Sequence, residues 1–369
     1  MEVKIKTAVL QDMMLKAVKG VGNDKAMPVT QWMGIEADGE HLCLTTTDGE
    51  NILTVFDKAE SITEPSAFTI SAEMFSKLVA KTTTEFIKLH QEANVLKVVG
   101  NGSYTFPLSC DEDGELVVMP RVKLSGDEDL AGEIDAKELR DIYSAGKATI
   151  ATTTATMVFC GFYLFDKGVV TSNGSKCTFI KQKIVEKPLL LNNSLMTLAT
   201  LIGTEKAKFF TYDNKVFITG KGLAVQGVNM PELSEYPIES ILDFTALEFP
   251  NTVKLNKLAL TNILDRVGLF VSQYDKNGVS FNFGDSGVTV ADLHGSATEL
   301  LKTDTKNTPF TIELDIQSLR DMLSVNPEEI VVLDYGKPEA VRVTFGKTVQ
   351  VLSSQLSEDE AQAAEQEEK

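Results

Sequence analysis

The residue types that most often perform catalysis are present in this chain but do not form a catalytic pattern. The three histidines, His41, His90 and His294, lie far apart and show no metal-binding spacing. The acidic run 111–115 lacks the ligand spacing of a calcium loop, and Gly220-Lys-Gly222 fits a hairpin turn better than a phosphate-binding loop. No nucleophile stands in a recognisable motif with a base. We therefore expect no catalytic residue, no metal site and no cofactor.

The cysteines and the hydropathy pattern indicate where the protein acts. Cys43, Cys110, Cys160 and Cys177 are widely spaced and form no CxxC pair, so we expect four buried thiols. No apolar run is long enough to cross a bilayer, and the start MEVKIKTAVL lacks the features of a signal peptide. These features predict a cytoplasmic protein that has no membrane partner.

The elements that must position any functional residue recur with a regular spacing. Six short extended runs begin at intervals of about sixty residues, and each leads into a segment with apolar residues at helical spacing. In the first, Leu10, Met13, Met14, Ala17 and Val18 share one helix face. β-rich sequence with turn pairs follows each helix, as at Asp38-Gly39. The predicted strands cover residues 3–5, 68–70, 132–134, 189–191, 253–255 and 310–314.

Each repeat therefore reads as a strand, a helix and about three antiparallel strands. One such unit buries too little apolar surface alone, so we expect the units to share cores in pairs. Polar breaks near 125–129 and 249–252 then predict three α+β domains, 1–125, 126–247 and 248–356, followed by an acidic disordered tail, 357–369.

The charges are unevenly distributed between these elements. The chain carries a net charge of −18, yet the six helical windows hold ten Lys or Arg against six Asp or Glu. If the repeats close into a ring with helices inside and sheets outside, a mildly basic lining faces a central pore. Such a lining can hold the phosphates of a polyanion without reading its sequence. Each residue alone can equally be an ordinary solvent-facing charge. The ten are Lys16, Lys19, Lys77, Lys81, Lys137, Arg140, Lys147, Lys257, Arg266 and Arg320.

On this framework the sequence resembles a bacterial-type DNA sliding clamp, the beta subunit of DNA polymerase III, in a divergent or phage-encoded form. The resemblance covers residues 1 to about 356. It rests on Thr46-Thr-Asp-Gly, on Thr171-Ser-Asn-Gly-Ser-Lys-Cys, on Tyr104-Thr-Phe-Pro-Leu and on Asn229-Met-Pro-Glu-Leu-Ser-Glu-Tyr-Pro. The order and spacing of these segments carry more weight than any one of them.

The resemblance implies a non-catalytic processivity factor of the polymerase holoenzyme. A head-to-tail homodimer of three tandem clamp domains would form a ring around double-stranded DNA, with helices lining the pore and antiparallel sheets outside. It would tether the replicative DNA polymerase and other partners through short peptides, and a clamp-loader ATPase would open it.

The resemblance also implies residue roles, and each of these positions can alternatively be ordinary core or surface. Tyr104, Phe270 and Val271 would close the ring, and Lys25 would face the DNA. The family's histidine and arginine after the turn glycine are Ser175 and Lys176 here, and its terminal methionine-proline-methionine is replaced, which indicates a different peptide preference. The implied partner pocket comprises Phe159, Ser172, Gly174, Ser175, Lys176, Cys177, Ile241, Val341, Val343, Val351 and Leu352.

Two other functions fit the composition. One is a β-rich cytosolic hydrolase that uses scattered carboxylates, which one deep pocket with two convergent acids would favour. The other is a protein-binding scaffold whose ring never holds DNA.

Overall fold

The computed structural model describes residues 1–355, apart from eight residues within that range, and it leaves the side chains of 154–156 undescribed. The eight are Asn23, Lys25, Thr153, Thr204, Gln273, Asp275, Lys276 and Thr305. Two compact units are present, Met1–Arg140 with Leu191–Met230, and Asp141–Leu190 with the described residues from Pro231 onward. The predicted tail, 357–369, and Lys25 lie outside the described residues.

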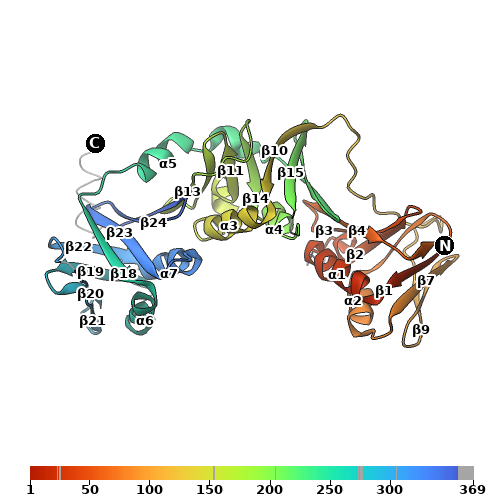
Figure 1. The fold of residues 1–369 in the computed structure, drawn as a ribbon, viewed down its shortest axis with the longest axis horizontal. Helices are drawn as coiled ribbons and strands as arrows, with labels where there is room; N and C mark the ends of the chain where they lie inside the picture. The colour runs from red at the N-terminus through yellow and green to blue at the C-terminus, as the bar shows by residue number, and fades with distance from the viewer. Residues whose placement is uncertain are drawn as a thin grey trace. The chain divides into compact units, whose positions relative to one another are not determined.

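All six predicted strand–helix starts are present, and in each the strand runs directly into the helix (Figure 1). Helices α4, α6 and α7 begin with a side-chain cap, because Asn192, Asn256 and Asp315 each accept a hydrogen bond from a backbone N–H three residues later. The pairs are β1 (Glu2–Lys6) and α1 (Thr7–Ala17), β6 (Ser66–Ser71) and α2 (Ala72–Lys81), β10 (Asp129–Asp135) and α3 (Ala136–Lys147), β14 (Leu189–Asn192) and α4 (Asn193–Ala199), β18 (Asn251–Asn256) and α6 (Lys257–Val267), and β22 (Phe310–Asp315) and α7 (Ile316–Val325).

Three antiparallel strands follow each of these helices, as the turn pairs predict. They are β2 (Trp32–Ala37), β3 (His41–Thr47) and β4 (Ile52–Lys58); β7 (Phe86–Glu92), β8 (Val95–Val99) and β9 (Ser103–Pro107); β11 (Gly161–Phe165), β12 (Gly168–Ser172) and β13 (Lys176–Ile180); β15 (Lys206–Tyr212), β16 (Lys215–Gly220) and β17 (Leu223–Val228); β19 (Gly278–Gly284), β20 (Gly287–Asp292) and β21 (Thr298–Leu301); and β23 (Ile330–Lys337), β24 (Ala340–Phe345) and β25 (Thr348–Ser353). The α+β class with antiparallel sheets is therefore confirmed.

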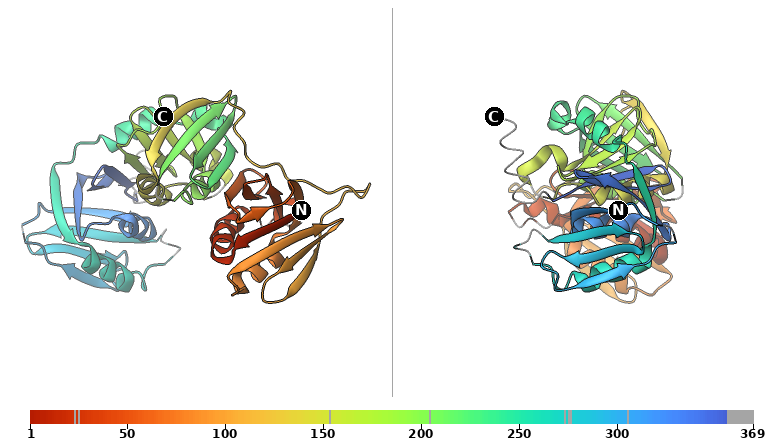
Figure 2. Two further views of the ribbon diagram at one scale, coloured as in Figure 1. Left: turned by 45° about the vertical axis from the view of Figure 1, so that its right-hand side comes forward. Right: turned by 90° about the vertical axis from the view of Figure 1, so that its left-hand side faces the viewer.

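The first unit contains two sheets with helices packed against them. One sheet has the order β5-β1-β7-β8-β9, with β5 spanning Ser61–Ile62, and the other has the order β10-β15-β16-β17-β4-β3-β2-β6. Helices α1 and α2 lie side by side, and α1 also packs on β3 and β4 (Figure 2). The predicted apolar face of α1 is confirmed, since Leu10, Met13, Met14 and Ala17 are buried.

The second unit repeats this design with strands from the second and third predicted domains. Its sheets have the orders β14-β11-β12-β13-β25-β24-β23-β18 and β21-β20-β19-β22, and α6 packs against α7. Strands β13 and β25 join the two halves of the larger sheet, with Cys177 opposite Val351. One helix, α5 (Ile238–Thr245), has no counterpart in the sequence prediction, and it packs on β13 and β25. The predicted domain limits near 125 and 247 fall in irregular segments, and they stay predictions.

Residues 117–124, here called the strap, belong to the long connection between β9 and β10 and contact the eight-stranded sheet of the first unit. The Arg121 guanidinium lies 2.7 Å from Asp38 and 3.3 Å from Glu36, both on or beside β2. The backbone N–H of Val122 donates to Thr54 on β4, and the Val122 side chain packs with Phe217 of β16. The strap therefore fastens strands of the first predicted domain to strands of the second.

Replacing Arg121 with Ala is expected to lower the free energy of unfolding of the first unit by about 2–3 kcal/mol, because two carboxylates lose a largely buried partner. Burial raises the pKa of Asp38, but hydrogen bonds from Arg121 and from the N–H groups of His41 and Glu40 outweigh it and lower that pKa to about 2. A carboxyl group whose pKa is lower in the folded state stabilises the protein at pH values above its unfolded-state pKa. This contribution is lost as the pH falls toward 2. The difference between the wild type and Arg121→Ala should therefore shrink between about pH 4 and pH 2.

Denaturant unfolding followed by the fluorescence of Trp32, the single tryptophan, measures this difference. Lys123→Ala, an exposed substitution in the same strap, is the matched control and should change the midpoint little. Equal midpoints for wild type and Arg121→Ala at neutral pH would show that the ion pairs do not hold the strap.

Candidate functional site

A cavity of about 550 Å³ opens in the second unit between α5, the turn after β12, and the end of β25. It brings together six of the eleven predicted pocket residues with five that were not predicted. The predicted ones are Phe159, Ser172, Gly174, Lys176, Cys177 and Ile241, and the others are Ser240, Phe244, Glu339, Ser353 and Ser354.

The turn between β12 and β13 is fixed by its own side chains. The Asn173 carboxamide oxygen accepts hydrogen bonds from the backbone N–H groups of Ser175 and Lys176, at 3.0 and 2.9 Å. Gly174 has a φ of 94°, a left-handed conformation that favours glycine. Ser353 at the end of β25 donates to the carbonyl of Ser175, so strand and turn hold one another. This wall of the cavity is therefore formed before any ligand arrives.

The apolar part of the cavity rests on an aromatic cluster. The Tyr236 ring stacks on Tyr163 with centroids 4.7 Å apart, and it meets Phe159 edge-on at 6.1 Å. Burial raises the pKa of the Cys177 thiol to about 12, although a backbone hydrogen bond from Val351 opposes this, so the thiol stays neutral and apolar at pH 7. With the buried side chain of Ile241, these groups make a surface that suits an apolar anchor.

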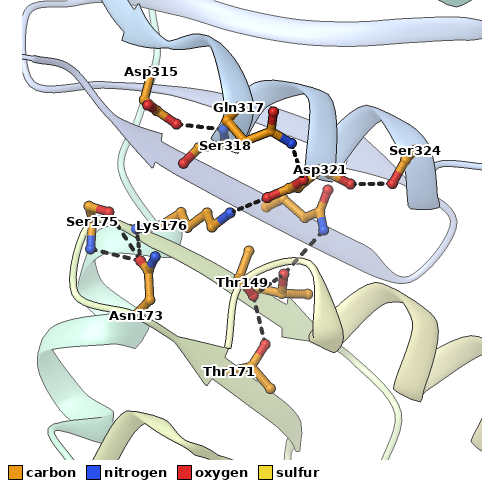
Figure 3. Close-up of polar contacts among 12 residues, drawn as sticks. Thr149, Thr171, Asn173, Ser175, Lys176, Asp315, Gln317, Ser318, Asp321 and Ser324 are labelled. Atoms are coloured by element: carbon orange, nitrogen blue, oxygen red, sulfur yellow. Dashed lines mark hydrogen bonds and ion pairs between the residues drawn. The ribbon is translucent and has the colours of Figure 1, made fainter. Parts of the chain in front are cut away.

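Lys176 is the one cation among the described residues that line the cavity, and it pairs with a residue of α7 (Figure 3). Its ammonium lies 2.9 Å from Oδ2 of Asp321, and only 7% of the lysine side chain is exposed. The other carboxylate oxygen, Oδ1, accepts a hydrogen bond from Gln317 at 2.9 Å. Both oxygens of Asp321 are thus engaged.

The remaining predicted pocket residues do not line the cavity. Val341, Val343, Val351 and Leu352 are buried in β24 and β25, and Ser175 is exposed on the turn. The five unpredicted residues come mainly from α5 and from the end of β25. Ile238, Ile241 and Leu242 have the i, i+3, i+4 spacing that could have indicated α5.

Several of the predicted DNA-facing cations also bind neighbouring helices. Arg140 of α3 donates to the carbonyls of Ile202 and Gly203 just beyond α4, at 2.9 and 3.1 Å. Arg320 of α7 donates to Leu264 of α6, and Lys257 of α6 donates to Asn326 at the end of α7. Cations suit these carbonyls because they carry the negative end of the helix dipole. Part of the binding capacity of these three residues is therefore used within the chain.

The other predicted cations differ in how far they are paired. Arg266 forms a bidentate ion pair with Glu299, at 2.7 and 2.6 Å. Lys16 and Lys77 each pair with an acid four residues earlier, Asp12 and Glu73. Within the described part of the chain, no ion pair involves the exposed residues Lys19, Lys81, Lys137 and Lys147. These four are the best placed to meet an external anion.

Two sheet edges carry exposed apolar side chains, one in each unit. Strand β9 is the edge of the five-stranded sheet, and Tyr104 on it is 39% exposed. Strand β21 is the edge of the four-stranded sheet, and Leu300 on it is 44% exposed. The predicted ring-closure residue Phe270 is 56% exposed, while Val271 is partly exposed. Unpaired edges with apolar side chains favour pairing with another chain.

The described residues contain neither a metal-binding cluster nor a membrane-spanning helix. No three His, Cys, Asp or Glu side chains there come together as a possible metal site. No helix among the same residues is long and apolar enough to cross a membrane.

Known proteins resemble this chain in two respects, the sequence of its first part and its fold. Residues 1–120 match the model described as the N-terminal domain of the DNA polymerase III beta subunit. No curated protein sequence matches the chain. Its fold is similar to those of DNA polymerase III beta subunits from several bacteria.

Three of these structures illustrate the similarity. The Borrelia burgdorferi subunit, in complex with a natural product, has a TM-score of 0.84 at 14% identity, covering 96% of this chain and 99% of that one. The Thermotoga maritima subunit gives 0.82 at 14% identity, covering 96% and 100%. The Pseudomonas aeruginosa sliding clamp, bound to griselimycin, gives 0.83 at 16% identity, covering 97% and 100%. The resemblance inferred from the sequence is therefore confirmed: the first 120 residues match the family of DNA polymerase III beta subunits, and the chain has the fold of a bacterial sliding clamp.

Proposed function

We propose that the protein is the sliding clamp of a replicative DNA polymerase. Two copies join head to tail into a ring that encircles duplex DNA without sequence specificity. The ring tethers the polymerase and other partners, acts in the cytoplasm as a non-catalytic subunit, and is opened by a clamp-loader ATPase. The observation that carries this proposal is the match of almost the whole chain to the clamp fold.

The two exposed sheet edges support a head-to-tail dimer. In such a dimer, the β9 edge of one copy meets the β21 edge of the other, and the strands add to form a continuous sheet. Tyr104 on one side and Phe270 and Val271 on the other supply apolar contact. The interface is heterologous, and two copies close it because each supplies one edge of each kind.

The four exposed lysines that form no ion pair among the described residues support DNA binding. Lys19 follows α1, Lys81 ends α2, and Lys137 and Lys147 lie at the two ends of α3. Flexible ammonium groups on helix surfaces contact phosphates as point charges and do not read bases. Binding of this kind holds the duplex and leaves it able to slide.

The cavity supports tethering by a peptide. It is concave, has an apolar floor and has hydroxyl groups at its edge, as a site for a short segment with apolar anchors requires. The cavity lies in the unit that contains strands of the second and third predicted domains, and the family resemblance implies a partner pocket between these domains.

Mass measurement and single-particle imaging together test this proposal. We expect a particle of about twice the 40.3 kDa chain mass with a central hole. A monomer without a hole would contradict the clamp proposal, and a monomer with two convergent acids in one deep pocket would favour the hydrolase alternative.

A further inference from the structure

The one cation among the described residues that line the peptide cavity is already paired. It is Lys176, whose ammonium faces Asp321 at 2.9 Å (Figure 3). Asp321 lies on α7 and is itself bonded to Gln317, so the pair is fixed from both sides. A carboxylate on a ligand would have to compete with Asp321 for Lys176.

The surface around the cavity carries acidic side chains. Glu339 lines it, and Glu239 and Asp243 stand one residue before the lining residues Ser240 and Phe244 on α5. We call Glu239, Asp243 and Glu339 the rim acids. The side chains of all three are exposed, and helix α5 contains no Lys or Arg.

The neighbouring elements also carry negative charge. The short helix η4 (Pro231–Glu235), which leads toward α5, contains two glutamates and no basic residue. Lys337 lies 3.8 Å from Glu339, and it compensates part of that charge. The elements around the cavity therefore carry more exposed acids than exposed cations.

We propose that this cavity selects peptides whose apolar anchors are flanked by Lys or Arg, and that it discriminates against acidic flanks. The inference rests on the proposed peptide-binding function and specifies its partner. The apolar floor supplies binding that does not depend on charge, while the rim acids attract flanking cations over distances within a Debye length. Acidic flanks meet like charge at the edge and find the one lining cation occupied.

Asp321 contributes to this selection by neutralising Lys176. In Asp321→Asn the ammonium of Lys176 loses its charged partner, so its positive charge is no longer neutralised. Acidic-flank peptides should then bind better than they do to the wild type, and the preference for basic flanks should fall. This reversal distinguishes selection at the cavity from general attraction to an acidic protein.

Three synthetic peptides test the proposal on the full-length protein. They share two leucines and one phenylalanine as anchors, and are flanked by two lysines, two serines or two glutamates. Fluorescence anisotropy at about 50 mM and about 500 mM salt measures the affinities. We expect the lysine peptide to bind the wild type on the order of tenfold more tightly than the glutamate peptide at low salt, and the difference to shrink at high salt.

Two variants with equal charge changes locate the effect. Glu239→Gln/Asp243→Asn/Glu339→Gln removes the rim acids and should reduce the preference to about twofold or less. Glu112→Gln/Glu328→Gln/Glu329→Gln changes three exposed acids outside the cavity and should keep the preference. Competition by excess unlabelled serine peptide confirms that all three peptides share one site.

The outcomes separate the inference from the proposed function. Binding of all three peptides with equal affinity would overturn the inference and leave the peptide site standing. An equal loss of preference in both triple variants would overturn it too, because net charge alone would then explain the selection. Failure of every peptide to bind would overturn the peptide-binding function and this inference with it.

Discussion

The double substitution Ile241→Ala/Phe244→Ala is expected to weaken binding of the replicative polymerase at least about thirtyfold, which corresponds to about 2 kcal/mol. Both side chains line the cavity from α5, and Ile241 is buried. Truncating them removes the apolar surface that a peptide anchor would contact, and alanine preserves the helix because of its high helix propensity. Surface plasmon resonance with the polymerase of the same cell measures the loss.

The same helix provides a matched control. Ile238→Ala/Leu242→Ala removes side chains of similar size from α5 at positions that do not line the cavity. Thermal unfolding of both variants shows whether the helix persists. If the control weakened polymerase binding as much as the cavity variant at equal stability, the cavity would not be the tethering site.

Neutralising the four exposed helix-end lysines is the second change with a large expected effect. In Lys19→Gln/Lys81→Gln/Lys137→Gln/Lys147→Gln, affinity for a duplex should fall on the order of a hundredfold at low salt. If each lysine contacts one phosphate, the slope of log affinity against log salt should fall by about 0.9 for each lost contact. Fluorescence anisotropy with a labelled linear duplex over a salt series measures both quantities.

Lysines on strands and loops provide the control for this experiment. Lys88→Gln/Lys97→Gln/Lys187→Gln/Lys254→Gln makes the same change in net charge at exposed positions outside the helices. A clamp that holds DNA against its helices should bind DNA almost normally with these substitutions. Equal losses in the two quadruple variants would indicate binding through net charge alone and would exclude a helix-lined DNA path.

The repeated strand–helix units could be predicted because their signals are local. Apolar spacing of 3.6 residues after a short extended run defines α1 through Leu10, Met13 and Met14, and the same pattern recurs five more times. Turn pairs such as Asp38-Gly39 then mark the hairpins. Helix α5 has apolar residues at the same spacing, but no strand leads directly into it, so it falls outside the repeated strand–helix pattern.

The polar contacts of the site depend on long-range packing and could not be predicted in the same way. Arg121 and Asp38 are 83 residues apart, and Lys176 and Asp321 are 145 apart. No local pattern pairs such residues, because the sheet brings them together only after the strands have found their register. The roles of Arg140, Lys257 and Arg320 at helix ends were missed for the same reason: each carbonyl partner lies on another helix or just after it.

The pocket residues of the turn between β12 and β13 were implied by the family resemblance of the segment 171–177. Ser172, Gly174 and Lys176 belong to one turn, whose asparagine and glycine are typical of a tight connection between strands. Ser353 and Ser354 could not be placed from sequence, since only the pairing of β25 with β13 carries the end of that strand to the turn.

Topological retention on DNA tests the central claim most directly. The protein is loaded on nicked circular duplex by its clamp-loader ATPase, the salt is raised to suppress direct binding, and half of the sample is linearised by one cut. We expect the protein to stay on the circle and to leave the linear molecule, because a closed ring slides off a free end. Equal retention on both forms, or equal loss from both, would contradict the claim that this chain forms a ring around DNA.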